Sequence, residues 1–148
     1  MRRMLALLAA VACVSLLAPA SPASADDVRL YAIMTGAAER PGPGDPDGIG
    51  RAVITIDDET NQLCVAVQFA NITVPTTGFH IHLAPPTAAG PVVVPLAPPT
   101  TNQSYQCVTV ADEALLHNIA TNPQQYYINL HTVPLYAAGA IRGQLQFA

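Results

Sequence analysis

The sequence has no lysine and no tryptophan, and only 11% of its 148 residues are charged. All ten acidic residues lie after position 25, where only four arginines oppose them, so this part of the chain carries a formal charge of −6. A nucleic acid or an anionic membrane surface is bound through a basic surface, and the chain has none. Both are therefore excluded as partners.

Long apolar runs are absent beyond the N-terminus. Arg2 and Arg3 precede an apolar run over residues 4–17, and Ala23-Ser24-Ala25 then offers the small residues that a signal peptidase requires. The run is shorter than the roughly 20 residues of a membrane-spanning helix. We expect residues 1–25 to be a signal peptide and residues 26–148 to form a single secreted domain with no membrane span. Lipid anchoring at Cys13 is the less favoured alternative.

Cysteine is scarce: without the expected signal peptide, only Cys64 and Cys107 remain. In an exported chain such a pair indicates one disulfide, which would close a loop of about 43 residues and contribute about 4 kcal/mol. Two buried free thiols are the alternative. Because two thiolates cannot complete the usual four ligands, a metal site made of cysteines alone is excluded.

Motifs of common hydrolases are also missing. No serine lies in a nucleophile-elbow context, and the acidic residues gather in the 36–50 segment, the 57–61 turn and the start of a helix. Acidic residues in such places are typical of solvated turns and helix caps, so we predict no carboxylate pair for hydrolysis. The sequence favours a non-enzymatic role and leaves enzymatic activity open.

The chain does contain short runs of alternating apolar and polar residues, separated by segments rich in proline and glycine. Residues 57–61 form a polar turn between two such runs, which predicts an antiparallel hairpin. Asp112 is a plausible N-cap of one short helix that Asn122-Pro123 ends. The pattern predicts an all-β fold, an antiparallel Greek-key β-sandwich or barrel of seven to eight strands with one short helix. The expected strands are 28–34, 50–57, 63–70, 77–83, 91–96, 104–110, 126–132 and 139–147.

Three histidines are the candidate functional residues. His80 and His82 alternate along one expected strand, so they share a face, and His131 lies in another. Three imidazoles suit copper or zinc and leave a coordination position open. The alternative is a structural polar seam in which each ring donates to a carbonyl or to a neighbour such as Asn129. Both interpretations stay open, so the cofactor is either none or copper.

Several segments together resemble the CHRD domain family, first recognised in chordin. They are Glu39-Arg-Pro-Gly-Pro-Gly-Asp-Pro-Asp-Gly-Ile-Gly50, His80-Ile-His82, Ala89-Gly-Pro-Val-Val-Val-Pro-Leu96, Asn122-Pro with Tyr126-Tyr-Ile-Asn-Leu-His-Thr132, and Gly139-Ala-Ile-Arg-Gly-Gln-Leu145. The segment after the histidines, Leu83-Ala-Pro-Pro-Thr87, departs from the glycine-containing turn that is more usual in this family. The resemblance implies an extracellular β-rich domain. The favoured hypothesis for its function is a non-enzymatic binding or structural module for an unidentified extracellular protein or ligand.

A weaker resemblance is to copper/zinc superoxide dismutase, through Gly78-Phe-His-Ile-His82 and Ala138-Gly-Ala-Ile-Arg142. It implies that His80, His82 and His131 bind copper and that Arg142 attracts an anion beside the metal. The zinc-binding loop and the bridging histidine of that family have no counterpart here. Arg142 can equally be a structural clamp that binds carbonyls. A copper-binding protein is therefore the alternative function, after the non-enzymatic module.

Overall fold

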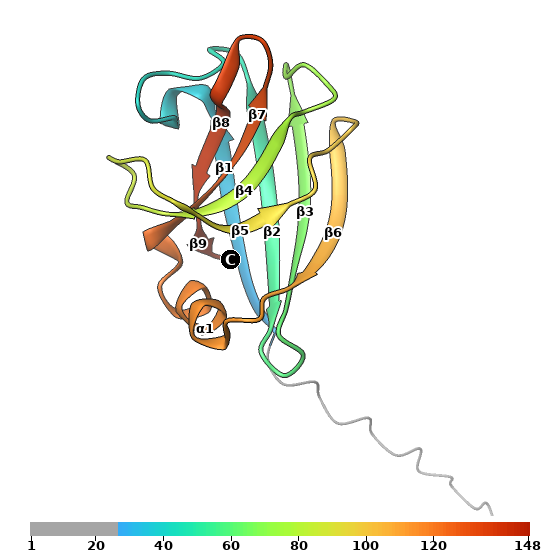
Figure 1. Cartoon of the computed structure of the whole chain (residues 1–148), viewed down its shortest axis with the longest axis vertical. Coiled ribbons are helices and arrows are strands. Elements are labelled where there is room, and N and C mark those ends of the chain that lie inside the picture. Colours follow the sequence, from blue (N-terminus) through green and yellow to red (C-terminus); the bar gives the residue numbers. More distant parts are fainter. Residues whose placement is uncertain (1–26) are drawn as a thin grey trace, which may run out of the picture.

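The computed structural model describes residues 27–148, and within them the chain forms one curled antiparallel sheet (Figure 1). The expected signal peptide and Cys13 lie outside the described residues. The strands are β1 (Val28–Thr35), β2 (Ile49–Asp57), β3 (Gln62–Ala70), β4 (Gly78–Leu83), β5 (Val92–Leu96), β6 (Gln103–Thr109), β7 (Tyr126–Thr132), β8 (Tyr136–Gln144) and β9 (Gln146–Phe147). The helices are α1 (Glu113–Thr121) and the 3-10 turns η1 (Gly36–Ala38) and η2 (Pro123–Gln125).

The order of strands across the sheet is β5-β4-β7-β8-β1-β2-β3-β6, with β9 added to β1. The predicted hairpin between β2 and β3 is present, and several other neighbours are distant in sequence, as in Greek-key folds. The outermost strands, β5 and β6, face each other across the remaining gap. There Gln106 of β6 accepts from the Ala97 amide at 2.8 Å and donates to the Ala97 carbonyl at 2.9 Å. The all-β prediction is confirmed, as a nearly closed barrel.

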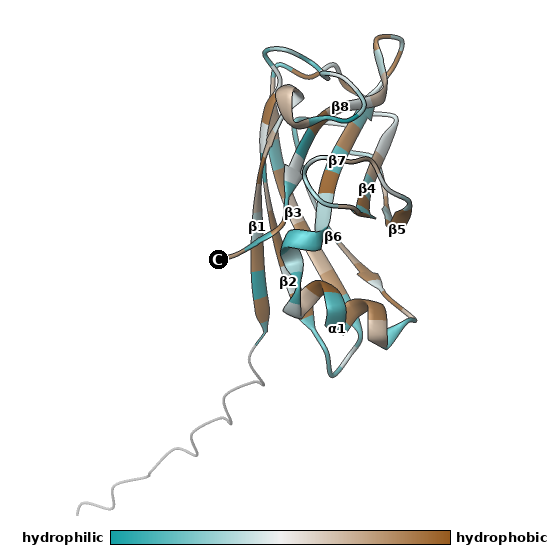
Figure 2. Ribbon diagram, turned by 90° about the vertical axis from the view of Figure 1, so that its left-hand side faces the viewer, coloured by the Kyte–Doolittle hydropathy of each residue, from teal (hydrophilic) through white to brown (hydrophobic). Residues whose placement is uncertain are grey.

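The core fills the inside of this barrel, because alternate residues of each strand point inward. Figure 2 shows the resulting stripes of apolar and polar residues along the strands. The apolar face predicted for β3 is confirmed, since Leu63, Val65, Val67 and Phe69 are all buried. Strand β4 buries Phe79 and Ile81, the neighbouring strand β7 buries Ile128 and Leu130, and both strands turn their histidines outward.

Helix α1 lies across one end of the barrel, as Figures 1 and 2 both show. Its N-cap is the predicted one, since the Asp112 side chain accepts from the Leu115 amide at 3.0 Å. Leu116 and Ile119 are buried against the core. The Tyr126 hydroxyl at the start of β7 donates to the Asn118 side chain at 2.9 Å, which ties the helix to the sheet.

Two expectations from the sequence are corrected. The last expected strand, 139–147, is split: β8 begins earlier and pairs mainly with β7, and after Leu145 the chain crosses to pair with β1 as β9. Leu145 is fully buried at that crossing, which anchors the bend. The segment between β1 and β2 is also more than a surface loop. It contains η1 and packs on β8, where the Asp45 amide donates to the Ala140 carbonyl at 2.8 Å.

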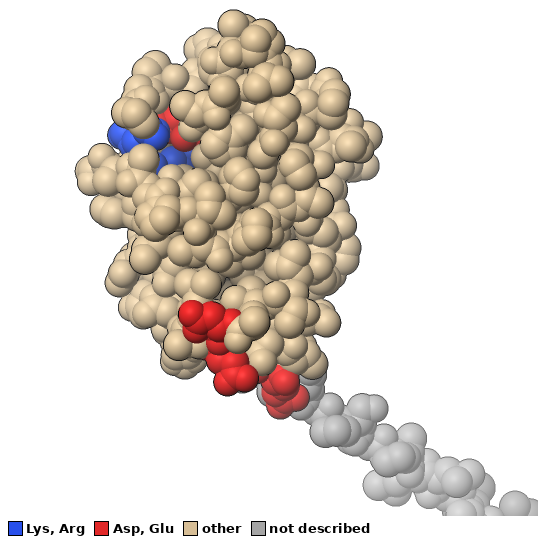
Figure 3. Space-filling model, viewed as in Figure 1, with Lys and Arg blue, Asp and Glu red and all other residues tan. Residues whose placement is uncertain are grey.

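Within residues 27–148, no helix has the length and apolarity needed to cross a membrane. On the face drawn in Figure 3 most of the surface is uncharged. Acidic side chains gather at the end of the molecule where α1 lies, and a small mixed patch of arginine and acidic side chains lies near the segment between β1 and β2.

Candidate functional site: a histidine cluster on the outside of the barrel

The candidate site lies on the outer side of β4, β7 and β8, which we call the histidine face. Its side chains are those that alternate with the core residues of the same strands. The strand register places them in two rows, His80–Asn129–Arg142 and His82–Tyr127–Gln144, and His131 lies opposite Gly78. Polar residues far apart in sequence therefore lie side by side on three adjacent strands.

Two segments cover the histidine face: residues 36–48, between β1 and β2, and residues 84–91, between β4 and β5 (Figure 1). The 84–91 segment is held through its backbone groups. Gln144 donates to the Ala84 carbonyl at 2.8 Å, and the Gly90 amide donates to the Tyr127 hydroxyl at 3.4 Å. The polar side chains beneath are consequently shielded from water although they lie outside the barrel.

The structure brings the three predicted histidines together. One ring nitrogen from each of His80, His82 and His131 lies within 4.8 Å of the other two. The His80 ring contacts the His131 ring edge-on, with centroids 5.1 Å apart, and the His82 ring lies 5.5 Å from that of His80. The imidazoles thus form one cluster, to which β4 and β7 both contribute.

Hydrogen bonds orient two of these rings. His131 Nδ1 lies 3.0 Å from the Ala137 carbonyl and His82 Nδ1 lies 2.9 Å from the Gly90 carbonyl. Since a carbonyl can only accept, Nδ1 carries the proton in both rings and Nε2 carries the lone pair when the ring is neutral. Carbonyls commonly orient metal-binding histidines in this way.

The lone-pair nitrogens lack good partners. His131 Nε2 and His80 Nδ1 are buried without any hydrogen bond. His82 Nε2 lies 3.0 Å from Asn129 Oδ1, an acceptor facing a lone pair. Asn129 can satisfy that nitrogen only by turning its amide so that the NH₂ group donates, whereas a metal ion would satisfy all three nitrogens at once.

The electrostatics keep two of the imidazoles neutral. Burial lowers the pKa of His80, and the neighbouring His131 and His82 rings lower it further. Burial also lowers the pKa of His82, and it outweighs the hydrogen bonds to Gly90 and Asn129, which act in the opposite direction. A neutral imidazole is the form that binds metals, so the cluster is ready for a metal at neutral pH.

Gly78 gives the cluster its room. A Cβ atom on residue 78 would lie 2.9 Å from His80 Cε1 and 3.0 Å from His131 Cδ2. Glycine at position 78 thus leaves space for the rings of His80 and His131.

Arg142 is buried on the histidine face, only 1% exposed, and acts as a clamp on residues 84–91. Its Nη1 donates to the Ala88 carbonyl at 2.8 Å and its Nη2 to the Pro85 carbonyl at 2.9 Å. Its Cζ lies 3.4 Å from the centroid of the Tyr127 ring, on which the His82 ring also stacks at 4.6 Å. These donors are occupied by carbonyls, which leaves the anion-binding role without support in the geometry.

Glu39 is the residue of this region that the sequence did not single out. We expected the acidic residues of segment 36–50 to be solvent-exposed, which is wrong for Glu39, 3% exposed, and for Asp45, 8% exposed. Burial raises the pKa of Glu39 to about 7, although the Arg142 charge and a hydrogen bond with Asn129 lower it. The signal that could have revealed Glu39 is its place in the segment shared with the CHRD resemblance.

Gly139 makes space for this carboxyl group. It adopts a φ of +143°, and a Cβ atom there would collide with the Glu39 carboxylate. Asn129 is close enough to Glu39 to lower its pKa, and its side-chain oxygen lies 3.0 Å from His82 Nε2, so this amide is near both the carboxyl group and the histidine cluster.

The two cysteines lie elsewhere on the barrel. Cys64 on β3 and Cys107 on β6 are directly opposite each other in the strand register and form the predicted disulfide. Both are on outward-facing positions of their strands. The disulfide thus fastens an edge strand of the sheet and takes no part in the histidine cluster.

Comparison with known proteins identifies one relationship. The family model described as "CHRD domain" matches residues 30–145, nearly all of the part of the chain that the structure describes. A search of curated proteins and a search of solved structures each found no match. The resemblance to copper/zinc superoxide dismutase consequently rests on the quoted residues alone.

Proposed function

The chain belongs to the CHRD domain family, and from that premise and the histidine cluster we propose that it is an exported β-barrel domain that binds one copper(II) ion through His80, His82 and His131. The observation that carries the proposal is the convergence of one ring nitrogen from each histidine, in a cluster where His80 Nδ1 and His131 Nε2 are buried without a hydrogen-bond partner. Unpaired buried polar atoms are rare in folded proteins, and these two support binding of a metal ion at the cluster.

Export is supported by the disulfide, because such bonds persist in oxidising compartments. The N-terminal sequence has the composition of a signal peptide. Copper(II) is favoured over other divalent first-row ions because an imidazole site generally binds it most tightly. An exported protein also meets metal ions outside the control of the cytoplasm.

The geometry requires a modest adjustment for the metal. Bonds of about 2.0 Å from a tetragonal copper(II) ion, the geometry that this ion prefers, place adjacent ring nitrogens roughly 2.8 Å apart and opposite ones roughly 4.0 Å apart. The widest separation in the cluster is no more than 4.8 Å, so rotation of the side chains has to close the spacings by up to roughly 2 Å. Asn129 has to withdraw from His82 Nε2 at the same time. Bound copper would act as a Lewis acid with a coordination position open to a further ligand.

We do not extend the proposal to superoxide dismutation. Nη1 and Nη2 of Arg142 donate to the carbonyls of Ala88 and Pro85, and the side chain is only 1% exposed, so an anion would have to displace segment 84–91 to reach it. The role as a non-enzymatic binding module is compatible with the metal site, since a bound ion can stabilise the domain without catalysis.

The test is metal content and stability of the purified protein after loading with copper(II) and, separately, zinc(II). We expect about one copper per chain and a higher melting temperature in excess copper. His80→Ala should abolish both, and it is the best variant because His80 makes no hydrogen bond that its removal would break. The matched control is His117→Ala, which removes an exposed histidine of α1 and should change neither measurement.

Two results would contradict the proposal. One is a wild-type protein that retains less than a tenth of an equivalent of either metal. The other is equal metal retention by His80→Ala and the wild type, which would assign the bound ion to another place on the surface.

A further inference from the structure

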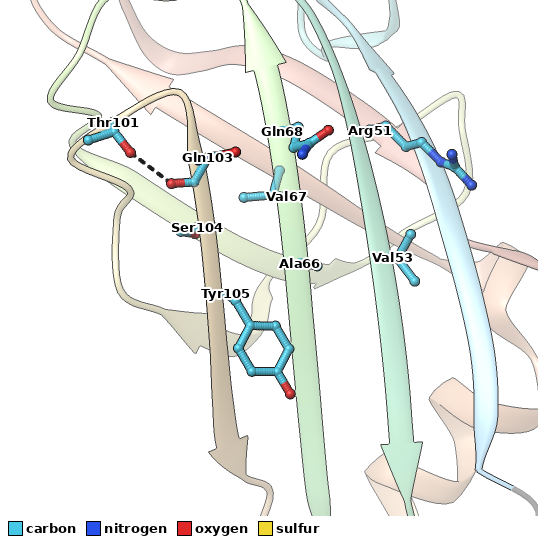
Figure 4. A pocket seen from close by; sticks show the side chains of 9 residues that line it. All are labelled: Arg51, Val53, Ala66, Val67, Gln68, Thr101, Gln103, Ser104 and Tyr105. Atoms are coloured by element: carbon cyan, nitrogen blue, oxygen red, sulfur yellow. Dashed lines mark hydrogen bonds between the residues drawn. The ribbon is translucent and has the colours of Figure 1, made fainter.

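A second surface of the barrel has the composition of a ligand site. It is the outer side of β2, β3 and β6, which we call the open face, since the segments that cover the histidine face do not line it. A hollow of about 590 Å³ lies on it, within the range of about 300–1,000 Å³ typical of small-molecule sites. Figure 4 shows the side chains that line this hollow.

The hollow has an apolar row and a polar row. The strand register aligns Val53, Ala66 and Tyr105 across the three strands, and next to them Arg51, Gln68 and Gln103. Neighbouring strands are about 4.8 Å apart, so each row spans about 10 Å. In Figure 4 the small Ala66 lies between Val53 on one side and Tyr105 on the other.

Tyr105 is 72% exposed, an unusual position for a large aromatic side chain. Its hydroxyl lies 3.3 Å from Cys107 Sγ, so the ring extends along its own strand toward the disulfide. The disulfide joins β6 to β3 two positions further on, which holds this edge of the sheet rigid. A flat aromatic surface is thus presented to solvent on a fixed support.

Arg51 supplies the charge. It makes no ion pair with any of the residues 27–148, although ten acidic residues outnumber the arginines in the chain. None of the residues lining the hollow is acidic. An unpaired guanidinium in such a setting is free for an anionic ligand and can bind a carboxylate through two parallel hydrogen bonds.

From these features we infer that the open face binds a polysaccharide of mostly neutral sugars in which an occasional unit carries a carboxylate, because one arginine on a chain without a basic surface can pair with a single carboxylate but not with a polyanion. A sugar ring has an apolar face of C–H groups, which matches the tyrosine ring and the alanine floor. Its hydroxyls both donate and accept, as the amides of Gln68 and Gln103 do. The carboxylate of a uronic acid unit would lie at Arg51, two strands away from the ring that packs on Tyr105.

An acidic peptide is the competing occupant, and the geometry disfavours it. An extended peptide gains most from pairing its backbone with a sheet edge. The hollow instead lies on the face of the sheet, and its donors run across the strands. This inference does not depend on the metal site, since no lining residue belongs to the histidine face.

The test uses the purified protein with three probes: an oligoxylan that carries one glucuronate unit, a neutral oligoxylan of the same length and poly-glutamate. We expect saturable binding of the glucuronate-bearing oligoxylan that weakens with added salt, and no binding of the other two. Arg51→Gln and Tyr105→Ala should each weaken binding at least tenfold. Both side chains are exposed, so both variants should fold normally.

Two control variants make the outcome decisive. Arg29→Gln removes the same charge from an exposed position on β1 outside the hollow and should change affinity less than twofold. His80→Ala should bind the sugar as the wild type does, which separates this inference from the metal proposal. The inference is overturned by absence of binding to the glucuronate-bearing oligoxylan, by equal binding of poly-glutamate, or by an Arg29→Gln effect as large as that of Arg51→Gln.

Discussion

The histidine face and the open face are built on the same barrel but differ in what lies over them. On both, outward side chains alternate with core residues of the same strands. Over the histidine face, segments 36–48 and 84–91 bury His82, Asn129 and Arg142. Among residues 27–148 no comparable segment lies over the open face, and Tyr105 and Arg51 are exposed.

The comparison shows that burial by a covering segment, rather than position on a strand, decides whether an outward-facing polar side chain needs a partner within the protein. A buried polar group needs a partner, because losing water without gaining a hydrogen bond costs about 1–3 kcal/mol. Arg142 therefore has carbonyl partners, and the histidine nitrogens without partners are informative. An exposed group such as Arg51 is satisfied by water and remains available to a ligand.

The largest effect is expected on the open face, from replacing both cysteines with serine. The disulfide closes 43 residues of chain, so its removal should lower the free energy of unfolding by about 4 kcal/mol. Urea denaturation of the variant and of the wild type measures this loss. Reduced wild-type protein should match the variant, and a loss below about 1 kcal/mol would mean that the barrel holds β6 without the bond.

The next effect should be on the histidine face. Arg142→Met removes the donors from the Pro85 and Ala88 carbonyls and the cation nearest to Glu39, and we expect a loss of about 3 kcal/mol. Arg51→Met on the open face is the matched control, with an expected change of less than about 0.5 kcal/mol. Hydrogen exchange should also become faster in segment 84–91 of the Arg142 variant. Equal losses in the two variants would remove the distinction between the faces.

The third prediction concerns pH and Glu39. Its pKa in the folded protein is about 7, raised from 4.5, so the folded state binds the proton more tightly than the unfolded state does. The stability that this proton provides is complete below pH 4.5 and is lost as the pH rises through 7, a change of about 3 kcal/mol. Glu39→Gln should remove this dependence and be more stable relative to the wild type at pH 8 than at pH 4.5.

The measurement is the difference between the two unfolding free energies at each pH. The difference is needed because His80 and His82, whose pKa values are lowered, lose protons over part of the same range in both proteins. If the difference stays flat from pH 4.5 to 8, then Glu39 is not buried as a neutral carboxyl group.

Much of the barrel could be predicted because its signals are local. Apolar residues alternate with other residues at Leu63, Val65, Val67 and Phe69. This alternation predicts a strand with one buried face, independently of which strands pair with it. The N-cap Asp112 and the turn at 57–61 are equally local. The split after Leu145 could not be predicted in this way, because it depends on which of two strands the chain pairs with.

By itself, the sequence determined which residues point inward and outward, the single disulfide-forming pair and the shared face of His80 and His82. Each follows from the two-residue period of a strand or from the count of a residue type. Only the tertiary structure decided that Glu39, from one of the covering segments, comes near Asn129 and Arg142 of the histidine face, while Arg51 stays exposed. Such contacts depend on the order of the strands and on the path of the connections between them. These bring together segments whose local sequences do not indicate that they will be neighbours.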